Sequence, residues 1–179
     1  MKIEAGRCRE ALWVPSPNFG ARPCADISLL VIHNISLPPG QFGGGYVQRF
    51  FQNELSIDQH PYFAEIAELQ VSSHFLIERT GKLVQFVNMK DRAWHAGLSS
   101  FAGRDNCNDY SIGIELEGTD DIPYTDAQYK VLADLTKAVQ CQYPAITMDR
   151  ITGHEHIAPG RKTDPGPAFD WLRYRADIG

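Results

Sequence analysis

The segment 153–166, GHEHIAPGRKTDPG, contains side chains that can bind a metal ion. His154 and Asp164 lie in it, and His33 ends an apolar run far upstream. Two neutral imidazoles and one carboxylate leave the fourth position of a tetrahedral zinc ion open for water, as in a catalytic site. Taken singly, each residue is more often structural, a core histidine or a turn former, because short motifs match by chance. Together they are the candidate metal ligands.

Two further residue types would complete a hydrolytic site. Glu115 lies on an otherwise apolar segment, where a carboxylate is costly unless it is paired or functional. Beside an activated water it would act as a general base. Glu117 shares its face and is a rival, although it is nearer the segment end and is expected to be more solvated. Lys162, close to Asp164, would stabilise a negative oxygen in a tetrahedral intermediate, or be an ordinary solvated lysine.

Aromatic residues in a long loop indicate a substrate cleft. Trp94 and His95 lie in the loop 90–109, and loops of this length in compact domains are usually functional. Trp94 would pack against a flat sugar or peptide face, or equally anchor the loop in the core. Tyr46, just after FGGG, would reach the same cleft. The glycine-containing segments 34–45 and 95–106 are candidates for movement.

The elements that must position these residues follow from hydrophobic periodicity. Continuous or alternating apolar runs predict strands, with a hairpin that turns at Thr80-Gly81, and residues spaced at 3.6 predict helices, the longest capped by Thr125. The strands are expected at 27–36, 73–87, 110–118 and 149–154, and the helices at 46–55, 124–144 and 167–178. Residues 1–25 are expected to form an irregular arm, and 56–71 an ordered loop. The pattern predicts one α/β domain over 1–179, a mixed central β-sheet flanked by α-helices.

Composition narrows the classes of partner. The chain has 179 residues and a formal net charge of −5, which disfavours non-specific binding to nucleic acid or membranes. Its first residues lack the apolar core of a signal peptide, and no run reaches the roughly 20 apolar residues of a membrane span. We therefore expect a cytoplasmic monomer. Its four cysteines are scattered and are expected to be free thiols.

Several longer motifs carry a family resemblance. LLVIHNISLPPGQFGGG, RAWHAG, CNDYSIGIELEGTD, YTDAQY and GHEHIAPGRKTDPGPAFDW resemble, in order and spacing, the AmpD family of cytoplasmic 1,6-anhydro-N-acetylmuramyl-L-alanine amidases. Their fold is shared with phage lysozyme-type amidases and peptidoglycan recognition proteins. The resemblance implies one zinc ion per chain, held by His33, His154 and Asp164. It also implies Glu115, rather than Glu117, as the acid–base residue.

The remaining roles are carried over in the same way. Lys162 matches the lysine that supports the transition state, and four residues fall where the family lines its substrate cleft: Asn34, Tyr46, Trp94 and His95. The chain departs from the pattern at His156, which replaces an acidic residue and, on a strand, would be an alternative ligand. Gln70 and Asn106 stand where some relatives have arginines.

The resemblance implies a reaction and a setting. The expected substrate is an anhydro-muropeptide, cut by zinc-dependent hydrolysis between the lactyl group of 1,6-anhydro-N-acetylmuramic acid and L-alanine. In relatives this activity belongs to peptidoglycan recycling, and its loss raises β-lactamase expression. Two alternatives stay open, a broader N-acetylmuramoyl-L-alanine amidase that acts on intact peptidoglycan and a non-catalytic muropeptide-binding module. A binding module would lack a ligand or the base, and all five expected residues are present.

Overall fold

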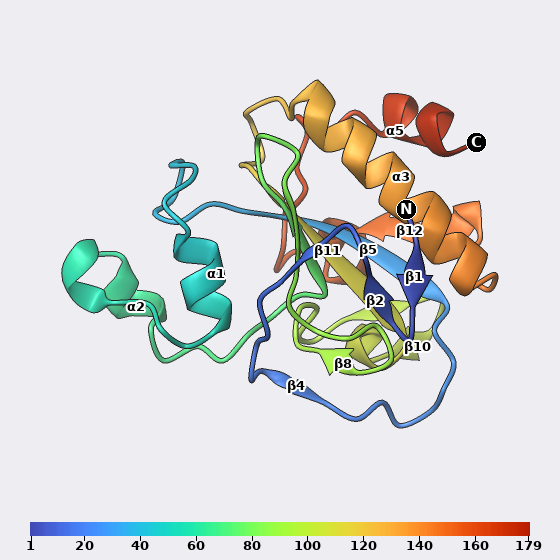
Figure 1. The fold of residues 1–179 in the computed structure, drawn as a ribbon, viewed down its shortest axis with the longest axis horizontal. Coiled ribbons are helices and arrows are strands. Elements are labelled where there is room, and N and C mark those ends of the chain that lie inside the picture. The colour runs from blue at the N-terminus through green and yellow to red at the C-terminus, as the bar shows by residue number, and fades with distance from the viewer.

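A six-stranded sheet forms the centre of the molecule in a computed structural model that describes residues 1–179 (Figure 1). Its strand order is β12-β5-β11-β6-β7-β3. The four strands from β12 to β6 are parallel, β6 and β7 form an antiparallel hairpin, and β3 pairs parallel to β7. In this order the strands span Ile151–Gly153, Leu29–Ile35, Ser111–Glu117, Phe75–Ile77, Leu83–Gln85 and Leu12–Trp13. The predicted mixed sheet is confirmed.

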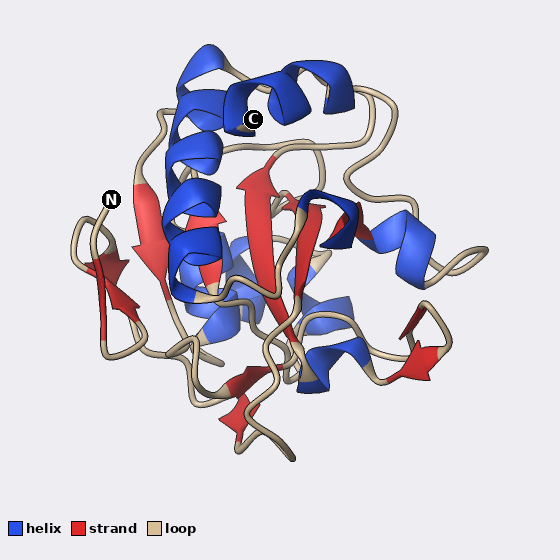
Figure 2. Cartoon of the chain, turned by 90° about the vertical axis from the view of Figure 1, so that its right-hand side faces the viewer, coloured by secondary structure: helices blue, strands red, loops and turns tan.

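Helices cover both faces of the sheet. Along β5, Leu30 and Ile32 pack in the core that includes α3 (Asp126–Gln142) and α5 (Trp171–Ile178). Leu29 and Val31 enter a different cluster, because side chains alternate across a strand. Figure 2 shows the long α3 running along the sheet, with α5 beside it at the C-terminus. The helices α1 (Tyr46–Phe51) and α2 (Phe63–Ile66) extend away from this pair in Figure 1 and pack in a second core.

Local sequence signals explain the best-predicted elements. Thr125 caps α3, accepting a hydrogen bond from the Gln128 amide at 3.1 Å, while the Gln128 side chain accepts one from the Thr125 amide. The expected apolar face of α3 is buried, including Leu132, Leu135 and Val139. These elements and the single α/β domain agree with the predictions.

The segments 90–109 and 142–157 contain several short elements. They comprise β8 (Arg92–Ala93), β9 (Ser100–Phe101), β10 (Arg104–Asp105), η2 (Cys107–Asp109), η3 (Met148–Arg150) and α4 (His154–Ile157). β9 and β10 form a small hairpin, and β8 pairs with β4. The loop 90–109 is therefore ordered by local pairs and turns.

Four predictions about local structure are wrong. Residues 1–25 contain four two-residue strands: β1 (Ile3–Glu4), β2 (Arg7–Cys8), β3 and β4 (Phe19–Gly20). The strand β3 joins the central sheet through backbone hydrogen bonds, which a pattern of side chains does not reveal. Residues 56–71 contain η1 (Ile57–Gln59) and α2. The helix at 46–55 ends at Phe51, since Asn53 has a φ of 61°. His154 begins α4 instead of ending a strand.

The remaining expectations concern thiols and membranes. All four cysteines are free, two of them buried, as predicted. None of the helices combines the length and the apolar character that a membrane crossing requires.

Candidate metal centre and catalytic cleft

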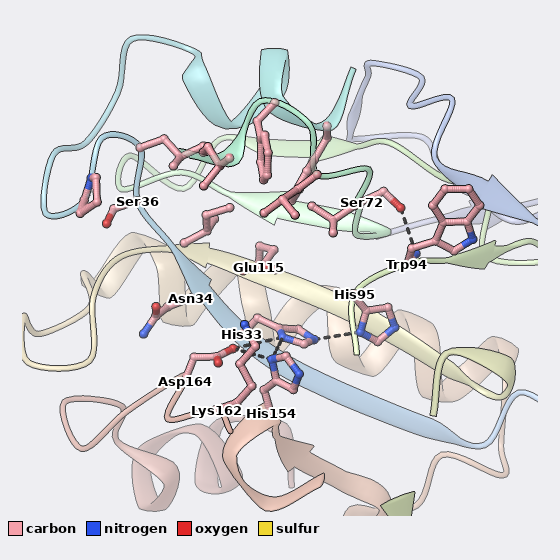
Figure 3. Close-up of a pocket in the computed structure, with 18 of the residues that line it drawn as sticks. His33, Asn34, Ser36, Ser72, Trp94, His95, Glu115, His154, Lys162 and Asp164 are labelled. Carbon is pink, nitrogen blue, oxygen red and sulfur yellow. Dashed lines mark hydrogen bonds and ion pairs between the residues drawn. The ribbon is translucent and has the colours of Figure 1, made fainter. Parts of the chain in front are cut away.

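Three side chains from separate parts of the chain converge at one end of the sheet. The Nδ1 atoms of His33, on β5, and His154, at the start of α4, are 3.0 Å apart. Asp164 Oδ2 lies 3.1 Å from each of them (Figure 3). Donors bonded at 2.0–2.2 Å to a tetrahedral zinc ion would be about 3.3 Å apart. The donor set and its spacing therefore fit zinc, and these are the three candidate ligands named from the sequence.

The protonation of this cluster also suits a cation. Burial lowers the pKa of His33 to about 4, so its ring is neutral at physiological pH. Burial alone would raise the pKa of Asp164, but hydrogen bonds from His154 and His33 outweigh it and hold that pKa well below its usual range. Neutral imidazoles and an ionised carboxylate are the forms that bind metals.

Glu115 lies directly across from His33 in the parallel register of β11 and β5. Its side chain is buried, and its Oε2 atom has no hydrogen-bond partner. Burial and, next, the negative charge of Asp164 raise the pKa of Glu115 well above 4.5, while the nearby Lys162 lowers it. An unpaired carboxyl group with a raised pKa beside a metal cluster is suited to accept and return a proton near neutral pH.

Glu117 occupies a different environment on the same strand. It is as buried as Glu115, and so the expectation of a solvated side chain is wrong. Its two carboxylate oxygens accept hydrogen bonds from the backbone amides of Gly43 and Arg79. Glu117 therefore joins the glycine-rich loop and the β6–β7 hairpin to β11, and its oxygens are already engaged.

A pocket of about 380 Å³ opens beside the cluster. One side is polar and includes Glu115, Lys162 and the candidate ligands. The opposite wall is apolar and comes from α1, α2 and the residues on either side of α2: Phe50, Phe51, Tyr62, Ile66, Leu69 and Val71. Its size lies within the range of small-molecule sites. Sequence reasoning missed the part of the wall that follows α1.

Three of the four candidate substrate-binding residues line the pocket, and Tyr46 does not. Asn34 and Trp94 line the pocket, although the Asn34 amide also donates to Asp120 and to the Pro165 carbonyl. Tyr46 does not line the pocket; it packs against Phe63, with ring centroids 5.0 Å apart. The roles of these residues toward a substrate stay predictions.

His95 reaches the pocket but is mostly behind His33. Both of its ring nitrogens have protein partners, the Nε2 atom of His33 at 2.9 Å and the Ser111 hydroxyl at 3.0 Å. Its ring is therefore committed to the support of His33. His156 is exposed on α4, and its Nδ1 atom lies 3.6 Å from the Glu155 carboxylate, away from the three ligands. The alternative of His156 as a ligand on a strand is wrong.

Comparison with known proteins places the chain in a family. A family model described as N-acetylmuramoyl-L-alanine amidase matches residues 23–167. The chain belongs to the N-acetylmuramoyl-L-alanine amidase family. The relationship within this amidase family spans nearly the whole chain: the 1,6-anhydro-N-acetylmuramyl-L-alanine amidase AmpD of Haemophilus influenzae is 57% identical over 177 residues, 98% of this chain and 96% of the relative.

Solved amidase structures share the fold of this chain. The crystal structure of a selenomethionine AmpD derivative superposes with a TM-score of 0.97 at 56% identity, covering 100% of both chains. AmpDh3 of Pseudomonas aeruginosa, solved in complex with an anhydromuramic pentapeptide, has a TM-score of 0.68 at 29% identity, covering 87% of this chain and 61% of that protein. The predicted family and fold are thus confirmed.

Proposed function

We propose that this amidase hydrolyses the amide bond between the lactyl group of 1,6-anhydro-N-acetylmuramic acid and the L-alanine of its stem peptide, with one zinc ion per chain. The observation that carries the proposal is the convergence of His33, His154 and Asp164 on one point, with Glu115 facing it inside a pocket. The near full-length relatives that share more than half of the sequence support the anhydro-muropeptide as substrate.

The site residues divide the chemistry among them. A bound zinc ion would polarise the scissile carbonyl and lower the pKa of a water molecule from about 16 toward 7. Glu115 takes a proton from the attacking water and returns it to the leaving amine nitrogen, a role for which its raised pKa fits. The Lys162 ammonium stabilises the negative charge that develops on the carbonyl oxygen. Asp164 and the two histidines would hold the metal ion.

The apolar wall has a separate task. Phe50, Ile66 and Leu69 carry only hydrocarbon side chains and cannot transfer protons, so they contribute contact area to the non-reacting parts of the substrate. Such contacts are made equally with the bound substrate and the transition state, so they favour binding without changing the reaction step. The wall thus sets affinity, whereas the polar side carries out the reaction.

We also propose that the enzyme works in the cytoplasm on muropeptides released during peptidoglycan recycling. Four cysteines without a disulfide are typical of proteins in a reducing compartment. In this setting, loss of the enzyme would let muropeptides accumulate and would raise the expression of an inducible β-lactamase.

Metal analysis paired with an amidase assay tests the proposal. Purified protein should contain one zinc per chain, and chelation should abolish cleavage of an anhydro-muropeptide until zinc is restored. Full activity in the chelated protein would contradict the zinc mechanism. A matched substrate without the anhydro ring separates the specificities, since equal cleavage of both would indicate the broader peptidoglycan amidase. Binding without cleavage of either would indicate the recognition module.

A further inference from the structure

The two candidate zinc-binding imidazoles depend on two consecutive residues. Each ring presents Nδ1 to the metal centre and Nε2 to the protein. The Nε2 atom of His33 lies 2.9 Å from His95 Nδ1, and the Nε2 atom of His154 lies 3.1 Å from the Ala96 carbonyl oxygen. The position of residues 95 and 96 therefore controls the orientation of both rings at once.

One side chain holds these two residues. The Oδ1 atom of Asn108 accepts hydrogen bonds from the backbone amides of His95, at 3.0 Å, and Ala96, at 2.8 Å. Asn108 is buried in η2, immediately before β11, so its carboxamide is fixed relative to the central sheet. Asn108 thereby connects the sheet to the two residues that contact the Nε2 atoms of His33 and His154, although it does not contact either histidine side chain itself.

Strand β11 supplies the remaining support for His95. The Ser111 hydroxyl lies 3.0 Å from His95 Nε2, and Gly113 leaves the space that the ring fills, since a Cβ atom there would come within 2.5 Å of its Cγ. On the Ala96 side, the Arg161 guanidinium donates to the same carbonyl oxygen at 2.7 Å. The segment 95–96 is thus fixed by contacts with Asn108, with β11 and with Arg161.

Metal binding would set the direction of the protons in this network. If His33 binds through Nδ1, its proton resides on Nε2 and is donated to His95 Nδ1. His95 then carries its own proton on Nε2 and donates it to the Ser111 hydroxyl. The arrangement selects the tautomer of His33 whose Nδ1 lone pair faces the centre, which is how outer contacts commonly strengthen a metal site.

We propose that Asn108 is a positioning residue for the zinc centre, acting through the His95–Ala96 segment on both His33 and His154. The proposal rests on the proposed function, because it requires that the centre binds zinc. Asn108 neither lines the pocket nor belongs to the candidate ligand set. Its removal would free two backbone amides and, with them, the acceptors that orient both rings.

The test measures zinc affinity by competition with a chromophoric chelator. Asn108→Ala should weaken zinc binding about 10–100-fold, the usual cost of losing a contact behind a metal ligand. Asn108→Asp retains an oxygen that can accept from both amides and should bind zinc at least as tightly as the wild-type protein. Asn18→Ala is the matched control: Asn18 is also buried, and its side-chain amide donates to the Val71 carbonyl and not to a partner of either ligand. It should lose thermal stability without losing zinc affinity.

If Asn108→Ala does not fold, Asn108→Asp carries the test: zinc affinity well below the wild-type level would overturn the proposal. A further variant probes the contact of His95 with β11. Ser111→Ala removes only one hydroxyl and should broaden or shift the His33 Nε2–H resonance in the ring-nitrogen NMR spectrum of the zinc-loaded protein. Unchanged zinc affinity in Asn108→Ala, or an equal loss in Asn18→Ala, would overturn the inference while the proposed function stands. A wild-type protein that binds no zinc would instead refute the proposed function, and the inference with it.

Discussion

The two sides of the pocket are built by different rules. On the polar side, His33 and His154 have hydrogen-bond partners at both ring nitrogens, supplied by elements of the central sheet and the loops that follow it. On the apolar wall, short helices hold the side chains by packing, and Leu69 is 51% exposed. The difference indicates that the chemistry requires fixed atoms, whereas substrate recognition requires only a surface of the right shape. Variants on the two sides should therefore fail in different ways.

The largest effect is expected for Glu115→Gln. Loss of the proton acceptor should reduce kcat about 10²–10⁴-fold, the usual contribution of acid–base catalysis. Zinc content should stay at the wild-type level, because Glu115 is not among the three ligands. Steady-state kinetics with metal analysis checks both, and Glu117→Gln provides the matched control on the same strand. A greater kcat loss in Glu117→Gln would mean that the acid–base assignment is reversed.

The same variant should be more stable than the wild-type protein after chelation. Burial raises the folded-state pKa of Glu115, so the unfolded chain releases this proton at lower pH, and wild-type stability falls as pH rises above 4.5. Glutamine cannot ionise and avoids this loss. Removing this ionisable group should therefore raise the melting temperature of the chelated protein at pH 7. Thermal melts should show this gain at pH 7 and its disappearance near pH 4; an equal gain at both would contradict the titration argument.

The sequence predicted the polar side better than the wall for a physical reason. His33, His154, Glu115 and Asp164 are chemically distinctive, and parallel strands bring their ends to one edge of a sheet. The convergence of these side chains could therefore be inferred from residue types and strand ends. The start of α4 at His154 was not predicted. Tyr62, by contrast, is an ordinary aromatic residue in a stretch where α2 spans only four residues. Too few turns exist there for a helical period to show.

Residues that position the site without lining its chemistry, such as Asn108, could not be predicted from the sequence. Asn108 lies in a polar loop, where an asparagine most often forms a turn. Its two hydrogen bonds to the amides of His95 and Ala96 depend on how the residues after β8 fold back beside η2, which is a tertiary property. Similarly, the solvent that was expected around Glu117 is excluded by Gly43 and Arg79, whose approach no local pattern indicates.

Lys162→Ala should have a somewhat smaller effect and sharpen the distinction within the polar side. If its ammonium acts as one donor to the developing oxyanion, kcat should fall about 10²–10³-fold. The lysine side chain is exposed and binds no metal in the proposed mechanism, so zinc affinity should not change. Single-turnover assays with parallel metal analysis measure the two quantities. A loss of zinc in step with activity would show that Lys162 supports the metal site and not the transition state.

The smallest effect is expected on the apolar wall, from Tyr62→Ala. Tyr62 is half-buried at the pocket, and losing one aromatic contact worth about 1.5 kcal/mol should raise KM roughly tenfold. Its kcat and zinc affinity should stay at wild-type values, because a contact made equally with substrate and transition state changes KM alone. Leu172→Ala, which truncates a side chain that is 85% exposed on α5, controls for loss of apolar surface. A fall in kcat for Tyr62→Ala would mean that the wall also aligns the reacting amide, and that the two sides of the pocket act together.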